Sequence, residues 1–201
     1  MKHAIIAGSL LLASSASFAA TNLVQNGSFE DYVLSNGHWT VLQSTSTWNS
    51  SGNNQGFEIQ RNAAGAAQDG KILVELDSHN LHPTHSHPAN YKSNSDIWQM
   101  ISTTAGNLYD ISFWYSPRPG VAAASNGLKA FWGNTEIASL QPSGTGLHQT
   151  SWTNWTGTFM ATASNTKLRF AAFGTEDTLG TYLDNVSVTL HQVSPVPEPE
   201  T

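Results

Sequence analysis

Apolar and polar residues alternate with a period of two in several short segments of the chain. In residues 108–115, Ile111, Phe113 and Tyr115 share one face of an extended strand, while Trp114 falls among polar residues on the other face. Segments bounded by Gly, Asn, Ser or Pro continue this pattern at 71–76, 97–102, 128–132, 137–140, 152–161, 167–173 and 181–190. We therefore predict an all-β fold, a two-sheet antiparallel β-sandwich of jelly-roll type.

The composition agrees with this prediction. Charged residues make up 11% of the 201 residues, against roughly 25% in an average soluble domain, and Ser, Thr, Asn and Gly are abundant where a helical bundle would carry Ala, Leu, Glu and Lys. With 39% hydrophobic residues and seven Trp, the chain can bury a core. The net charge of −6 and the lack of a basic cluster in the sequence argue against nucleic acid as a partner.

The N-terminal residues 1–20 have the plan of a secretory signal peptide, with a short positive start, an apolar run and small residues near a cleavage point. We expect residues 21–191 to form one β-sandwich binding domain in a secreted or cell-surface protein. The chain has no Cys, so no disulfide supports it, and its stability must come from the core, from a bound ion, or from both.

The C-terminal residues 192–201 form a linker that ends in a Val-Pro-Glu-Pro motif at 196–199. The motif resembles the start of the bacterial PEP-CTERM sorting signal. The resemblance implies handling by an exosortase-type sorting system and display at the cell surface or in the extracellular matrix. The sequence stops after the motif, so the apolar helix and basic tail of that signal are missing, and any membrane contact would be through that segment.

Several sequence strings resemble the galactose-binding-like jelly roll of many carbohydrate-binding modules. These strings are NLVQNGSFE at 22–30, GFEIQR at 56–61, DGK at 69–71, VELD at 74–77, SFWYSPRPG at 112–120 and YLDNVSV at 182–188. The resemblance implies a structural calcium ion where the first and last strands meet. Its ligands would be the carboxylates of Glu30 and Asp184 and the carbonyls of Ser28 and Lys71, a donor set that suits Ca²⁺. The alternative is that Glu30 is a turn residue and Asp184 a strand-end cap.

A histidine-rich stretch at 79–88 contains His79, His82, His85 and His87. Imidazole groups at this spacing could bind Zn²⁺ or Cu²⁺. Two Pro make the stretch an irregular loop, and no nearby carboxylate or thiolate completes a tetrahedral set. The alternative is a flexible polar insertion that binds metal only adventitiously.

Aromatic and polar residues supply candidates for sugar binding. Trp114, opposite the apolar face of its strand, is the best candidate for an exposed stacking platform, and the alternative for it is packing against a second sheet. Trp48, in a segment rich in Ser and Asn, and Trp39, which follows a Gly-His pair, could also be exposed.

Glu58, Arg61, Asp77 and Arg118 are candidates to orient a sugar through hydrogen bonds. The backbone of Arg118 is restrained by the Pro residue on each side. The alternative for Arg118 is a salt bridge to Asp77 or Glu58.

We therefore expect a non-catalytic, exported glycan-binding module with structural calcium. The alternatives are a structural matrix or biofilm protein without a sugar pocket, and a metal-binding surface protein that uses its His-rich loop. The sequence contains no nucleophile elbow, zinc-protease motif, phosphate loop or Cys nucleophile. A glycosidase would have to draw its paired carboxylates from Glu58, Glu75 and Asp77.

Overall fold

The computed structural model describes residues 20–51, 56–79 and 92–192. Within these ranges the chain forms ten strands and one short 3-10 turn, η1 (Ala123–Ser125). The strands are β1 (His38–Leu42), β2 (Phe57–Arg61), β3 (Leu73–Glu75), β4 (Asp96–Ser102), β5 (Leu108–Ser116), β6 (Gly127–Trp132), β7 (Thr135–Leu140), β8 (Thr153–Met160), β9 (Asn165–Phe173) and β10 (Tyr182–Leu190). The fold class is all-β, as predicted.

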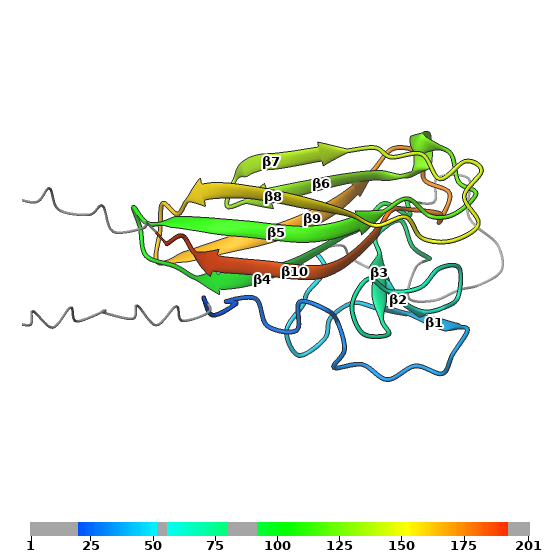
Figure 1. The fold of residues 1–201 in the computed structure, drawn as a ribbon, viewed down its shortest axis with the longest axis horizontal. Coiled ribbons are helices and arrows are strands. Elements are labelled where there is room, and N and C mark those ends of the chain that lie inside the picture. The colour runs from blue at the N-terminus through cyan, green and yellow to red at the C-terminus, as the bar shows by residue number, and fades with distance from the viewer. Residues whose placement is uncertain (1–19, 52–55, 80–91, 193–201) are drawn as a thin grey trace, which may run out of the picture.

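The strands form two sheets that pack face to face (Figure 1). The six-stranded sheet has the order β1-β2-β3-β10-β5-β8, and the four-stranded sheet has the order β4-β9-β6-β7. The paired strands are antiparallel throughout. This arrangement is the predicted β-sandwich of jelly-roll type, and the last strand, β10, lies in the middle of the larger sheet.

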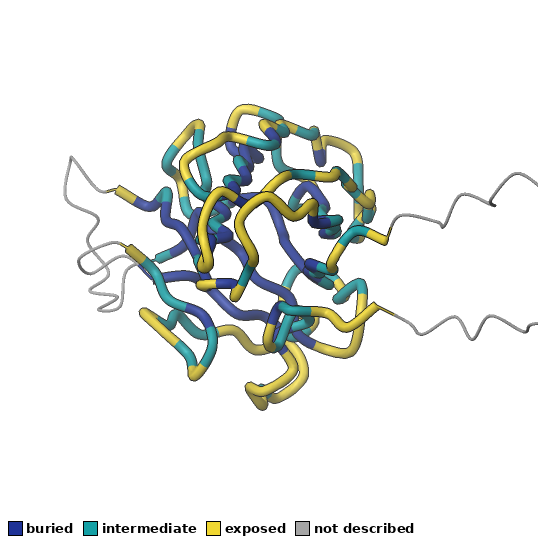
Figure 2. The backbone as a smooth tube through the Cα atoms, turned by 90° about the vertical axis from the view of Figure 1, so that its left-hand side faces the viewer, coloured by how far each residue is buried: buried dark blue, intermediate teal, exposed yellow. Residues whose placement is uncertain are grey.

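The core lies between the sheets and is filled by the inward residues of the alternating strands (Figure 2). Phe113 on β5 packs edge-on against Phe170 on β9, with ring centroids 5.0 Å apart. Trp48, which precedes the strands of the four-stranded sheet, is fully buried, and its indole N–H donates to the carbonyl of Asn26 at 3.0 Å. Trp48 is therefore a core residue, and of the two tryptophans expected to be exposed only Trp39 is.

The N-terminal segment joins the last strand, so the first and last described residues lie at the same end of the sandwich (Figure 1). The backbone N–H of Leu23 donates to Val188 O at 2.8 Å, and that of Val186 donates to Gly27 O at 2.9 Å. The side chain of Asn22 adds two hydrogen bonds to β10. Its Nδ2 donates to Val186 O, and its Oδ1 accepts the backbone N–H of Val188. The two chain ends are thus held together by hydrogen bonds, and Val24, Val186 and Val188 also pack in the same apolar core.

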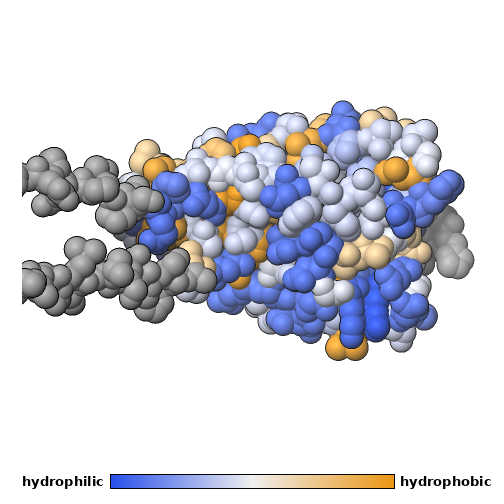
Figure 3. Space-filling model, viewed as in Figure 1, coloured by the Kyte–Doolittle hydropathy of each residue, from blue (hydrophilic) through white to orange (hydrophobic). Residues whose placement is uncertain are grey.

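The outer face of the six-stranded sheet is partly covered by loops. The backbone N–H of Ser151 donates to Ser116 Oγ at 2.9 Å, while Thr150 and Trp152 both donate to Ala66 O. Beneath these loops Tyr182 is fully buried although it points away from the core. Figure 3, viewed as Figure 1, shows a mainly hydrophilic and intermediate surface on which apolar residues form only small patches.

Across the three described ranges, no helix reaches the length and apolar character that a membrane span requires.

Candidate functional site

The residues implied as calcium ligands gather around one turn, residues 68–72. Glu30 Oε1 accepts the backbone N–H of Lys71 at 2.7 Å and that of the following residue at 2.7 Å. Ser28 Oγ donates to the carboxylate of Asp69 at 2.7 Å. The turn requires Gly70, which has a φ of +65° and would place a Cβ 2.4 Å from the Glu30 carboxyl carbon. The N-terminal segment is therefore hydrogen-bonded to the turn that precedes β3.

Asp184 contacts the same turn from β10. Its Oδ2 accepts the backbone N–H groups of Gln68 and Asp69 at 2.7 and 3.0 Å, and its Oδ1 accepts that of Asn185 at 2.7 Å. Asp184 is fully buried, and desolvation raises the pKa of its carboxyl group to about 7 in spite of these three hydrogen bonds. Ser28, Glu30 and Asp184 therefore contact the turn that contains the fourth implied ligand residue, Lys71. Backbone N–H groups occupy much of the hydrogen-bonding capacity of the two carboxylates.

The donor chemistry of this junction fits a hard cation. The carboxylate groups of Glu30 and Asp184 are of the kind that Ca²⁺ takes as ligands, and here both accept backbone N–H groups of the turn. No group of three or more His, Cys, Asp or Glu in the described part of the chain is arranged to hold a metal. An ion here would therefore depend on backbone carbonyls in addition to the two carboxylates.

A second polar cluster lies on the outer face of β2 and β3. Glu58 and Glu75 are directly opposite each other in this strand pair. Gln60 Nε2 donates to both, at 2.7 Å to Glu58 Oε1 and 2.5 Å to Glu75 Oε2. Arg118 Nη1 also donates to Glu75 Oε2, at 2.5 Å. The ion pair expected for Arg118 is thus formed with Glu75 and not with Asp77 or Glu58.

Burial controls the protonation of this cluster. Glu58 is 3% exposed and Glu75 is 0% exposed. Desolvation raises the pKa of Glu58 to about 7 and the pKa of Glu75 well above its ordinary value, against the attraction of the Arg118 guanidinium. Below pH 7 the cluster therefore retains protons that exposed carboxyl groups would have lost.

The other residues predicted to bind a sugar lie elsewhere. Asp77 is fully buried and accepts the backbone N–H of Asp177 at 3.3 Å, and desolvation raises its pKa to about 6. Arg61 donates to Leu34 O at 2.7 Å. Trp114 is half-buried on the outer face of the sheet, as its position in the alternating pattern predicted. The structure therefore brings only Glu58 and Arg118 together, and both belong to a largely buried cluster.

One of the four histidines expected to bind a transition metal is described. The His79 ring stacks on Trp39, with centroids 5.2 Å apart, and its Nδ1 lies 3.9 Å from Glu58 Oε2. His82, His85 and His87 lie outside the described residues, as do residues 1–19 of the predicted signal peptide and residues 193–201 with the Val-Pro-Glu-Pro motif.

The sequence analysis missed an open groove on the outer face of the four-stranded sheet, which we call the outer groove. It consists of two adjoining hollows of about 290 and 430 Å³, and the larger falls within the usual size range of ligand pockets. The hollows share Ser51, Asp96 and Arg169. The smaller is completed by Asn94, Ser95, Ala171 and Ala172, and the larger by Phe131, Gly133, Asn134 and Lys167.

Strand register builds the outer groove from residues distant in sequence. Trp98 on β4 lies opposite Arg169 on β9, which lies opposite Phe131 on β6. One pleat along, Asp96 lies opposite Ala171. The small side chain of Ala171 leaves the sheet surface low between larger neighbours, which creates the hollow.

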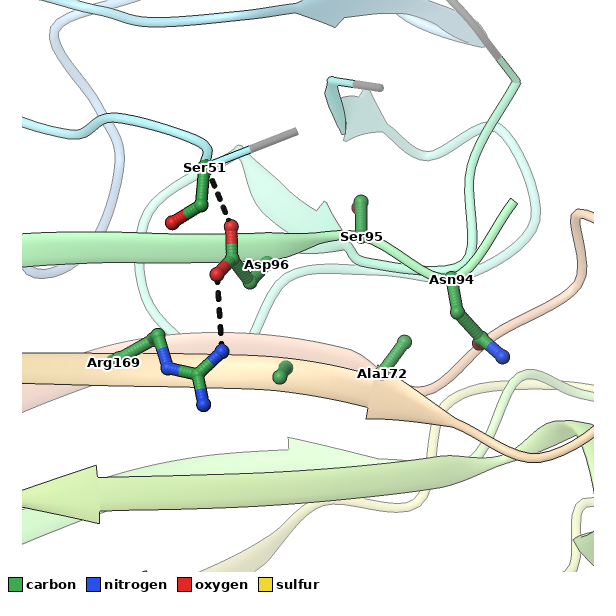
Figure 4. A pocket seen from close by; sticks show the side chains of 7 residues that line it. Ser51, Asn94, Ser95, Asp96, Arg169 and Ala172 are labelled. Carbon is green, nitrogen blue, oxygen red and sulfur yellow. Dashed lines mark hydrogen bonds and ion pairs between the residues drawn. The ribbon is translucent and has the colours of Figure 1, made fainter. Parts of the chain in front are cut away.

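Ionic contacts hold the centre of the outer groove in place. Asp96 Oδ1 accepts the backbone N–H of Ser51 at 2.7 Å, while Arg169 Nη1 donates to Asp96 Oδ2 at 3.1 Å (Figure 4). The Arg169 guanidinium also lies over the Phe131 ring, 4.2 Å from its centroid. Arg169 is thus fixed on two sides and retains further N–H groups for a ligand.

No protein-family profile matches the chain, and no curated protein matches it in sequence. The fold, in contrast, has many relatives among solved structures. TmCBM61, solved in complex with β-1,4-galactotriose, is similar with a TM-score of 0.52 and 19% identity over 86% of this chain and 100% of its own. The structural neighbours include carbohydrate-binding modules with the jelly-roll fold.

Proteins with other activities share the fold. A cyclase from Fischerella sp. TAU, in complex with 4-(1H-indol-3-yl)butan-2-one, has a TM-score of 0.59 and 15% identity over 88% of this chain and 100% of its own. The K2 cleaved adhesin domain of Lys-gingipain has a TM-score of 0.50 and 12% identity over 82% of this chain and 97% of its own. At such identities the likeness concerns the fold alone, and function has to be argued from the site.

Proposed function

We propose that this protein is a non-catalytic carbohydrate-binding module that holds a glycan in its outer groove. The observation that carries the proposal is the groove itself, an open hollow with polar walls on the exposed face of a sheet. Hydroxyl, amide and charged groups line it, and these can hydrogen-bond to sugar hydroxyl groups. The TmCBM61 complex supports the proposal, because it shows that a protein with a similar fold binds a galactotriose.

A binding role is favoured over catalysis by where the carboxyl groups lie. Glu58, Glu75 and Asp77, the three candidates for a hydrolytic pair, are all buried. A glycosidase needs two carboxyl groups that reach the scissile bond, and these three groups are instead engaged with protein atoms.

We further propose that the module acts outside the cell, at the surface or in the matrix, after export through residues 1–20 and sorting through the motif at 196–199. A calcium ion bound by Glu30, Asp184 and backbone carbonyls would reinforce the junction of the chain ends. Such an ion would be structural, because it would add charge-assisted contacts between β10 and the turn at 68–72.

The experiment that tests glycan binding uses the full chain on a panel of neutral and acidic polysaccharides, followed by affinity electrophoresis. Ala171→Tyr fills the smaller hollow and should abolish binding. Ser112→Tyr places the same side chain on the outer face of the six-stranded sheet and should leave binding unchanged. Equal binding by both variants would place the site elsewhere. Self-association without saturable glycan binding would favour the matrix-protein alternative.

A further inference from the structure

Cationic side chains are concentrated on the face that carries the outer groove. The sequence contains eight Lys and Arg in a chain of net charge −6. Three of the eight, Lys129, Lys167 and Arg169, stand on neighbouring strands of the four-stranded sheet, β6 and β9. Asp96 and Glu136 each pair with one of these cations, so these five groups keep a net excess of one positive charge. On an acidic protein, this local excess would attract an anionic ligand.

Each of these cations lies over an aromatic ring. Lys167 Nζ is 4.4 Å from the centroid of the Trp98 ring, and the Arg169 guanidinium is 4.2 Å from that of Phe131. Lys129 Nζ lies 5.5 Å from the centroid of Phe173. Such contacts hold the cations against the sheet. They also cover ring faces on which the C–H groups of a neutral sugar would stack, so the groove offers positive charge where a neutral-glycan site would offer bare rings.

The two cations that line the larger hollow are available to a ligand. Arg169 shares one nitrogen with Asp96, and its planar guanidinium has further donors. Within the part of the chain that the structure describes, Lys167 forms no ion pair with a carboxylate. By contrast, Lys129 is engaged by Glu136 at 2.8 Å. Lys167 and Arg169 can therefore receive an anionic group that enters the hollow.

We propose that the outer groove recognises the carboxylate groups of an acidic polysaccharide, a polymer of uronic acid units, with Lys167 and Arg169 as the carboxylate-binding pair. This inference rests on the proposed function and specifies its ligand class. The sugar ring would lie over the low surface at Ala171, with its hydroxyl groups near Ser51 and Asn134. A charge-assisted hydrogen bond from each cation would discriminate the acid from its neutral counterpart.

The test compares polymers that differ only in the carboxyl group. Polygalacturonate, alginate and glucuronan are each paired with their carboxyl-reduced forms, and binding to the full chain is measured by calorimetry. We expect at least one acidic polymer to bind, and its carboxyl-reduced form to bind with an affinity lower by about tenfold or by a larger factor. The affinity for the acidic polymer should fall as the salt concentration is raised. Polyglutamate, which carries carboxylates without sugar rings, should also bind about tenfold more weakly.

Two variants assign the effect to the groove. Lys167→Gln should weaken binding of the acidic polymer about tenfold, which is the size expected for one charged hydrogen bond, and Lys167→Glu should abolish it. Lys92→Gln removes an exposed positive charge that pairs with Glu176 at 2.8 Å and does not line either hollow, and it should leave the affinity unchanged.

The possible failures are distinguishable. Equal binding of acidic and reduced polymers, blocked by Ala171→Tyr, would overturn the uronate inference while the module remained glycan-binding. No binding to any polymer would overturn both proposals. Equal binding of polyglutamate would show a general anion-binding face that does not select a glycan.

Discussion

Glu58 and Glu75 face each other across β2 and β3 as a directly opposed pair of acids on a shielded face of the sheet. Like charges in opposed positions destabilise a sheet, and here each is deprived of water as well. Gln60 bridges the two carboxyl groups, and Arg118 supplies a single positive charge from the loop after β5. The fold tolerates the pair because the raised pKa values favour the uncharged, protonated acids and because the Arg118 guanidinium compensates negative charge at Glu75.

Removing that guanidinium should destabilise the fold. We expect Arg118→Met to lower the free energy of unfolding by about 3 kcal/mol, because breaking a buried ion pair leaves a buried carboxyl group without its charged partner. Urea denaturation followed by tryptophan fluorescence measures the change. Arg61→Met, which removes a hydrogen bond to Leu34 O, serves as the control and should cost about 1 kcal/mol. Equal losses in both variants would show that the Arg118 charge has no special part in stability.

The same cluster predicts that stability falls as the pH rises. The pKa of Glu58 is raised from its ordinary 4.5 to about 7, so the folded state holds a proton that the unfolded chain has already released between these values. This contribution is complete below pH 4.5 and is lost as the pH rises to about 7. In a buffer without divalent ions, the melting temperature should therefore fall between pH 5 and pH 8, and less steeply in Glu58→Gln. A slope unaffected by that substitution would contradict the assignment to Glu58.

Calcium should stabilise the chain if the junction of the chain ends binds it. A ligand at 100 times its dissociation constant adds about 2.7 kcal/mol to the free energy of unfolding. We expect thermal unfolding to occur at a higher temperature with Ca²⁺ than with EDTA, and Glu30→Gln to remove most of the difference. If the wild-type chain unfolds at the same temperature in both buffers, the junction does not bind calcium, and hydrogen bonds and apolar packing hold the ends without an ion.

Trp48 and Trp39 should differ sharply in their effect on stability. Trp48 is fully buried and packs against Phe29, with ring centroids 5.4 Å apart, so Trp48→Ala should cost about 3–5 kcal/mol through the cavity it leaves. Trp39 is 44% exposed, and Trp39→Ala should cost about 1 kcal/mol or less. Chemical denaturation of both variants measures this difference. Similar losses in the free energy of unfolding would contradict the placement of Trp48 in the core.

The sequence pattern predicted most strands because alternation is a local signal. The strand expected at 97–102 is β4 (Asp96–Ser102), and that expected at 108–115 is β5 (Leu108–Ser116). The same signal placed Trp114 correctly on the outer face. It did not reveal β1 (His38–Leu42) or β2 (Phe57–Arg61). The residues of β1 are half-buried or exposed, and a strand at a sheet edge has little apolar pattern to detect. β2 is only five residues long, and its polar residues Glu58 and Gln60 are buried with the apolar ones.

The candidate site was less predictable because it depends on register between distant strands. Trp98, Phe131 and Arg169 form one row only because β4, β9 and β6 pair with particular offsets. No property of any one segment marks this row. The burial of Glu58 and the ion pair of Arg118 with Glu75 could not be predicted for a related reason, because the segments that surround them are also remote in sequence.

The central position of β10 has a consequence for when the protein can fold. β10 separates β3 from β5 in the six-stranded sheet, and its distal half also receives the N-terminal segment. A nascent chain that lacks residues 182–190 can pair β1 with β2, β2 with β3, and β5 with β8, but it lacks the strand that joins these two pieces of the sheet. Pairings between such distant segments also form slowly, because much chain entropy is lost before any contact compensates. Folding therefore has to wait until the whole chain has been synthesised, and the polypeptide remains open to chaperones or a translocation channel until then.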